Sequence, residues 1–133
     1  MQKEMVIVIL IIIVVVIVNA VTDNYTNKSI SNINSKLEEI SDMARQNLLN
    51  DVKENKKADE KMEELRNEWN SINKKLAFYI EHDELEKVDT SIVEINEYLK
   101  LGLYDEAVPE IKKCIFILEH IKDKGSLQII NLF

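Results

Sequence analysis

The feature that most constrains this chain is an unbroken run of fourteen apolar residues, Met5–Val18 (MVIVILIIIVVVIV), near its N-terminus. Counted to Val21, the run has seventeen residues and one polar interruption, Asn19. At about 1.5 Å per residue, this is the lower end of what crosses the hydrocarbon of a bilayer. A soluble buried strand is the alternative, but strands rarely exceed about ten residues. In lipid a single segment satisfies its backbone hydrogen bonds only as a helix, so we predict a membrane helix over residues 5–21.

The residues around the run leave both retention and cleavage open. The triplet Val18-Asn19-Ala20 is similar to a signal-peptide cleavage site, which would give a cleaved, secreted protein. The run is long for a signal-peptide core, however, and Lys3 is opposed by Glu4. We therefore favour an uncleaved anchor. Lys3 is the only Lys or Arg on the short side, which predicts a cytoplasmic N-terminus and residues 22–133 outside the cell membrane.

The composition of the remaining chain indicates helices and excludes several classes of partner. Two Gly and one Pro are too few for a β-sandwich with its many turns, and residues that form helices well predominate. We predict an all-α fold: an N-terminal transmembrane helix followed by an antiparallel bundle of three to four helices. The net charge of −7 argues against nucleic acid or anionic lipid as a partner. Cys114 is the only cysteine, so no intramolecular disulfide can form.

We expect three parts: an anchor over residues 1–21, a polar spacer and membrane-proximal helix over 22–57, and a bundle with an apolar tail over 58–133. Residues 21–29 (VTDNYTNKS) are polar and turn-prone, which predicts the spacer. Apolar residues at spacings of three and four predict helices over 30–56 and 58–79. The pattern does not decide whether the helix over 30–56 continues the anchor.

Two further helices are expected, over 84–100 and 106–122, joined as an antiparallel hairpin. Asp83 and Asp105 are predicted to cap their N-termini. Gly102 is predicted to end the first of them in the left-handed conformation, and Gly125 to end the second. The buried faces are predicted to comprise Ile30, Ile33, Leu37, Ile40 and Ala44; Ala58, Met62, Leu65, Trp69, Ile72, Leu76 and Tyr79; Leu85, Val88, Ile92, Ile95 and Leu99; and Val108, Ile111, Cys114, Ile115, Leu118 and Ile121.

The sequence offers one metal-site hypothesis and no catalytic one. His82 and His120 each follow a glutamate, Glu81 and Glu119, and zinc accepts such ligands. Neither pair has the spacing of a His-x-x-x-His motif, and histidines on solvated helix ends explain the pattern equally well. No nucleophile motif or phosphate-binding loop is present. We therefore expect neither an enzyme nor a bound cofactor.

Four residues are candidates for contact with a partner protein. Trp69 lies in the middle of an apolar stripe, where packing in the core is its default role and partner binding the alternative. Leu127, Ile130 and Phe133 belong to the apolar tail LQIINLF, which is expected either to fold back over the bundle or to meet a partner. The resulting hypothesis is an anchored, non-enzymatic interaction or scaffold module that binds another protein or a second copy of itself. The alternative is a domain that binds a metal or small ligand through His82 and His120.

The chain also resembles an uncharacterised family of small membrane-anchored proteins from low-GC Gram-positive bacteria, of the domain-of-unknown-function type. The resemblance rests on the anchor Met5–Val18, on Trp69 with the stretch 79–85 (YIEHDEL), and on 118–121 (LEHI) with Ser126, Leu127, Asn131 and Leu132. It implies an anchored helical domain. It implies no activity and no catalytic residue.

Overall fold

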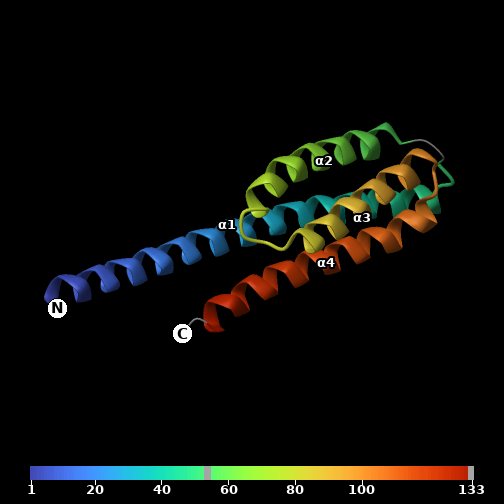
Figure 1. The fold of residues 1–133 in the computed structure, drawn as a ribbon. Coiled ribbons are helices and arrows are strands. Elements are labelled where there is room, and N and C mark those ends of the chain that lie inside the picture. The colour runs from blue at the N-terminus through green and yellow to red at the C-terminus, as the bar shows by residue number, and fades with distance from the viewer. Residues whose placement is uncertain (53–54, 132–133) are drawn as a thin grey trace.

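The computed structural model describes residues 1–52 and 55–131, with side chains as far as Lys124. In these residues the chain forms four α-helices and no strand: α1 (Gln2–Leu49), α2 (Lys56–Leu76), α3 (His82–Lys100) and α4 (Tyr104–Asn131). Successive helices run antiparallel, and α4 packs against both α3 and α1, which closes a four-helix bundle (Figure 1). The predicted all-α bundle with a long apolar N-terminal helix is confirmed.

The core consists of the apolar stripes that periodicity predicts. On α1, the five predicted positions are all fully buried. Trp69 of α2 is 1% exposed, and all five predicted residues of α3 are buried. The departures from the predicted stripes are small: Tyr79 is partly exposed, and Val108 and Ile115 are only partly buried. Burial of these stripes is the main stabilising contribution to the fold, because each fully buried aliphatic side chain contributes about 1.5–3 kcal/mol.

The predicted polar spacer over residues 21–29 is instead part of α1, which continues without a break from Gln2 to Leu49. Two threonines show how polar residues are accommodated in it. The Thr22 hydroxyl donates to the Val18 carbonyl at 2.9 Å, and the Thr26 hydroxyl donates to the Thr22 carbonyl at 2.7 Å. Burial against the bundle begins at Thr26. Tertiary packing thus overrides the turn preference of these residues.

The first two predicted helices end earlier than expected, α1 at Leu49 and not at residue 56, and α2 at Leu76 and not at residue 79. Of the four residues predicted to cap or end the other helices, three differ from the prediction and one agrees. α3 begins at His82 with Glu81 at the N-cap, so Asp83 lies inside its first turn, where a carboxylate favours the helix dipole without capping the helix. Likewise, α4 begins at Tyr104, which puts Asp105 in its first turn. Gly102 has φ 69°, the predicted left-handed conformation. Gly125 does not end α4, which continues to Asn131, because a glycine weakens a helix by only about 1 kcal/mol.

Candidate functional site

The N-terminal half of α1 projects from the bundle as a single exposed apolar helix (Figure 1). Its most apolar window has a mean hydropathy of 3.3, and none of that window is buried. In the described part of the chain, this is the one helix long and apolar enough to cross a membrane. The C-terminal half of the same helix forms one side of the bundle core. We call the end of the bundle from which this apolar half emerges the proximal end, and the opposite end the distal tip.

The proximal end carries aromatic side chains from α1 and from the α2–α3 loop, which lies where α1 leaves the bundle (Figure 1). The Tyr79 hydroxyl is 2.7 Å from the Thr26 hydroxyl and donates to the Thr22 carbonyl at 3.4 Å. The Lys75 ammonium lies over the Tyr25 ring, 5.4 Å from its centroid. Phe78 is 90% exposed and does not belong to the core cluster.

Burial at this end also changes the ionisation of Tyr79. Desolvation is the main cause, and it raises the pKa of the phenol above its ordinary value of 10.0. The hydrogen bond with Thr26 acts in the opposite direction, by favouring the ionised form. Tyr79 is therefore a neutral hydrogen-bonding group that ties the α2–α3 loop to α1.

The distal tip combines exposed apolar side chains from both of its turns. Both the end of α1 and the α3–α4 turn lie there, because the helices alternate in direction (Figure 1). The exposed residues are Leu48, Leu49, Val52, Leu101 and Leu103. Leu49 is 85% exposed and Leu101 67% exposed. Exposed apolar groups that cluster at one end of a bundle are typical of a contact surface.

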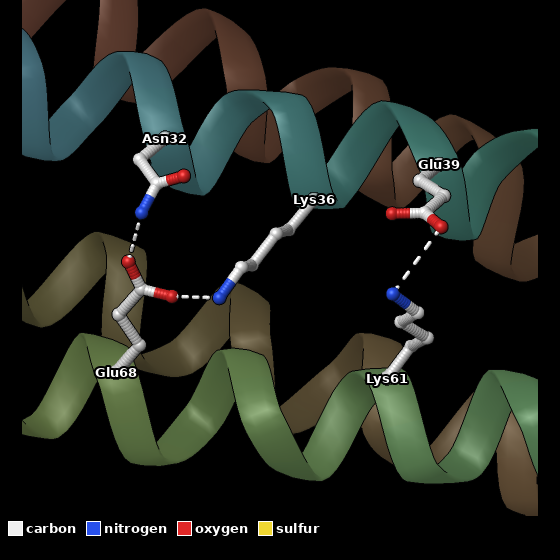
Figure 2. A network of polar contacts seen from close by, with 5 residues as sticks. All are labelled: Asn32, Lys36, Glu39, Lys61 and Glu68. Carbon is white, nitrogen blue, oxygen red and sulfur yellow. Dashed lines mark hydrogen bonds and ion pairs between the residues drawn. The ribbon is translucent and has the colours of Figure 1, made fainter.

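Charged and polar side chains connect α1 to α2 along the side of the bundle (Figure 2). The Glu68 carboxylate accepts hydrogen bonds from the Asn32 amide and the Lys36 ammonium. One carboxylate on α2 thereby joins two positions one turn apart on α1. Nearer the distal tip, Lys61 pairs with Glu39 at 3.3 Å. This arrangement fixes the register of the two helices and presents no reactive group.

The helix α1 also buries polar groups within the bundle. The Asn34 amide nitrogen donates to a Glu119 carboxylate oxygen at 2.8 Å, which links α1 to α4. Among the described residues, the buried side-chain atoms without a hydrogen-bond partner are Asn27 Oδ1, Asn34 Oδ1, Ser41 Oγ and Asn47 Nδ2. All four belong to α1. Such groups lower stability and favour one helix register over others.

The structure gives the two histidines no common site. His82 is exposed at the start of α3 and His120 is exposed on α4. Glu81 pairs with Lys124 at 3.5 Å, whereas Glu119 bonds to Asn34. Within residues 1–52 and 55–131, no three His, Cys, Asp or Glu side chains form a group that could hold a metal ion.

Of the four predicted interaction residues, the structure describes the side chain of one. Trp69 packs in the core, and its indole N–H donates to Asp89 at 2.5 Å, so its ring is not accessible to a partner. The backbone of Leu127 and Ile130 continues α4 as a helix and does not fold back over the bundle. The side chains of Leu127 and Ile130, and the whole of Phe133, lie outside the described residues.

Sequence reasoning missed Phe78 and the distal tip. Leu101 and Leu103 flank the predicted helix-ending Gly102, and Leu48 and Leu49 fall out of phase with the buried stripe of α1. An apolar residue out of phase at a helix end is the signal that could have identified them. The pattern cannot show that two such ends lie together, because this depends on the direction of each helix.

Cys114 is fully buried in the core cluster. Desolvation raises the pKa of its thiol from 9.0 to about 11. Since the thiolate is the reactive form, this cysteine is an inert packing residue at neutral pH.

The described part of the bundle includes two open grooves. One, of 480 Å³ between α2 and α3, is lined mainly by charged and amide side chains, including Glu63, Arg66 and Asn96. The other, of 560 Å³ between α1 and α2, begins at Val21 and passes Tyr25 and Ile72. Neither encloses a ligand-sized space with convergent polar groups, which is the usual form of a small-molecule site.

Together these features define a class of protein: a four-helix bundle built on a long N-terminal helix, half of which is an exposed apolar segment of membrane-spanning length. The chain belongs to the family described as "Domain of unknown function (DUF4363)", whose model matches residues 24–132. The match covers the bundle and begins after the apolar run. No curated protein and no solved structure gives a significant match.

Proposed function

We propose that this protein is a single-pass membrane protein whose helical bundle is a non-enzymatic module for binding another protein, with the distal tip as the docking surface. The anchor is residues 5–21, the N-terminus is cytoplasmic, and the bundle lies outside the cell membrane. The observation that carries the proposal is that one uninterrupted helix has an exposed apolar half and a half buried in the bundle core.

The placement of the distal tip supports a partner other than a neighbouring copy. The tip lies at the end of the bundle farthest from the apolar run (Figure 1). Copies anchored in one bilayer with the same orientation would present their tips side by side, facing away from the lipid. They could not meet tip to tip. The apolar side chains of Leu49 and Leu101 are therefore available to a second protein that approaches from the compartment of the bundle.

Site-specific photocrosslinking in cells that express the full chain tests this proposal. A photoreactive amino acid at Leu49 or Leu101 is expected to give a discrete protein adduct. The adduct from Leu49 should be lost when Leu103→Asp is added to the same chain. Asn70, which is exposed midway along α2, is the matched control position. No adduct from the tip, or the same adduct from position 70, would contradict a docking role for the tip.

Sidedness is tested with the same cells. A cysteine introduced as Leu101→Cys is expected to react with a membrane-impermeant maleimide in intact cells. Labelling that appears only after lysis would place the bundle in the cytoplasm and overturn the proposed orientation.

A further inference from the structure

We propose that the α2–α3 loop is a second membrane contact, in which Phe78 and Tyr79 lie in the lipid headgroup layer and hold the proximal end of the bundle against the bilayer. This inference rests on the proposed function, because it requires residues 5–21 to span the membrane. It adds a lipid-binding surface made by the bundle itself.

The first step is the height of the loop along α1. Contacts between the antiparallel helices α1 and α2 show that one residue forward on α2 corresponds to about one residue back on α1. These contacts are Lys61 with Glu39, Glu68 with Lys36, Lys75 with Tyr25, and Tyr79 with Thr22. The same register places Phe78 level with about residue 23 of α1. That level is only two residues, or about 3 Å, beyond Val21.

The second step is the thickness of the layer at that height. The headgroup region of each leaflet is about 5–7 Å thick, given about 30 Å of hydrocarbon in a bilayer of about 40–45 Å. A side chain about 3 Å beyond the end of the anchor lies inside this layer. Tyrosine is enriched there, because one end of its ring is apolar and the other accepts or donates hydrogen bonds. Phenylalanine inserts its apolar ring at the boundary between headgroups and acyl chains.

The third step is the length of the anchor. Seventeen residues span about 26 Å, which is about 4 Å less than the hydrocarbon they must cross. A short anchor draws its flanking residues towards the lipid. Since α1 continues into the bundle without a break, the bundle itself is drawn toward the bilayer, which brings the α2–α3 loop to the headgroups.

The exposure of the aromatic residues agrees with this placement. Phe78 is 90% exposed, an arrangement that is unfavourable for a phenyl ring in water. Tyr79 is tied to α1 through Thr26 and Thr22, so the loop is held at a fixed height. The backbone of α4 also reaches this level: the Asn34–Glu119 bond sets its register, which places Asn131 near the level of Thr22.

Spin labelling of the full-length protein in phosphatidylcholine nanodiscs tests the inference. Single cysteines would be introduced as Phe78→Cys, Leu101→Cys and Val14→Cys and labelled with a nitroxide. Cys114 is buried, and the pKa of its thiol is raised to about 11, so the unsubstituted chain is the control for selective labelling. Collisions with oxygen, which concentrates in lipid, would be compared with collisions with a water-soluble nickel chelate.

Leu101 is the matched control, since it is an exposed apolar residue in the turn at the opposite end of the bundle. The label at position 78 is expected to collide with the nickel chelate several-fold less often than the label at 101, and more often than the label at 14. Equal collision frequencies with the nickel chelate at positions 78 and 101, while position 14 is in lipid, would show that the α2–α3 loop does not contact the membrane. The proposed anchor would then still stand. If position 14 is also freely accessible to nickel, the anchor and the inference both fail.

Discussion

Ser41 illustrates the cost of the polar groups that α1 buries. Its side chain is fully buried and its hydroxyl has no hydrogen-bond partner in the structure, whereas Ser35, less than two turns away on the same helix, is exposed. Leaving a buried hydroxyl unpaired costs about 1–3 kcal/mol. Ser41 therefore opposes stability and restricts which helix registers are acceptable.

We expect Ser41→Ala to raise the free energy of unfolding by about 1 kcal/mol more than Ser35→Ala, which reports helix propensity alone. Urea unfolding of the full-length protein in mild detergent would measure both, with fluorescence of Trp69, the only tryptophan, as the probe. Equal gains in the two variants would mean that the Ser41 hydroxyl has a partner.

Because the thiol of Cys114 is buried, we expect the protein to lose stability at alkaline pH. The pKa of its thiol is about 11 in the folded protein and 9.0 when unperturbed. Above pH 9.0 the unfolded chain therefore releases this proton while the folded chain keeps it. The buried thiol makes its full contribution to the free energy of unfolding below pH 9.0. This contribution is lost as the pH rises to about 11, which lowers the free energy of unfolding by roughly 2–3 kcal/mol.

The Cys114→Ala variant separates this effect from the titration of other groups. Its free energy of unfolding is expected to fall less steeply over the same pH interval than that of the unsubstituted protein, whatever its stability at neutral pH. Parallel pH profiles for the two proteins would contradict the assignment.

At the scale of the helices, the pairing of α1 with α2 depends unequally on its two charged contacts (Figure 2). The Glu68 side chain is 23% exposed and binds two donors of α1. The Glu39 side chain is 49% exposed and pairs only with Lys61, which is 37% exposed. Exposed pairs contribute little, because water screens them and ordering long side chains costs entropy.

We expect Glu68→Ala to lower the free energy of unfolding by about 1–2 kcal/mol and Glu39→Ala by less than about 0.5 kcal/mol. Glu68→Gln should lie between them, since an amide oxygen still accepts from Asn32 but carries no charge for Lys36. The same unfolding measurement compares the three variants. A Glu39→Ala loss as large as that of Glu68→Ala would refute the ranking.

The helices also show where a sequence determines a fold and where it does not. Residues such as Leu37, Leu65 and Ile95 could be assigned to the core because the spacing of three and four is a property of a single helix. The ends of helices depend on neighbours. Residues 22–29 have the composition of a turn, and Gly125 that of a helix end, yet both lie inside helices.

The candidate surfaces were less predictable than the core for the same reason. Phe78 enters the proposed membrane contact only because the register of α1 and α2 places it beside the end of the apolar run. The distal tip exists only because Leu49 and Leu101, far apart in the sequence, lie at the same end of the bundle. Trp69 was a candidate for partner contact, because tryptophan is typical of binding surfaces. In the structure it lies in the core, where its indole N–H donates a hydrogen bond to Asp89.

At the scale of the whole molecule, the bundle should fold without the apolar half of α1. Every buried residue lies at or after Thr26, so a fragment of residues 22–133 retains all of the core described here. We expect this fragment to be soluble without detergent, helical by circular dichroism and cooperative in urea unfolding. The full-length protein should require detergent or lipid. A fragment that is largely unfolded would show that the apolar half of α1 is needed for the fold.

The continuity of α1 has a mechanical consequence. From Thr22 to Leu49 the helix extends for about 42 Å, so in the proposed membrane orientation it would hold the distal tip at a fixed height above the lipid. Because α1 has no break between this part and its apolar half, we expect a rotation or tilt of the proposed membrane segment to be transmitted along the helix to a protein bound at the distal tip.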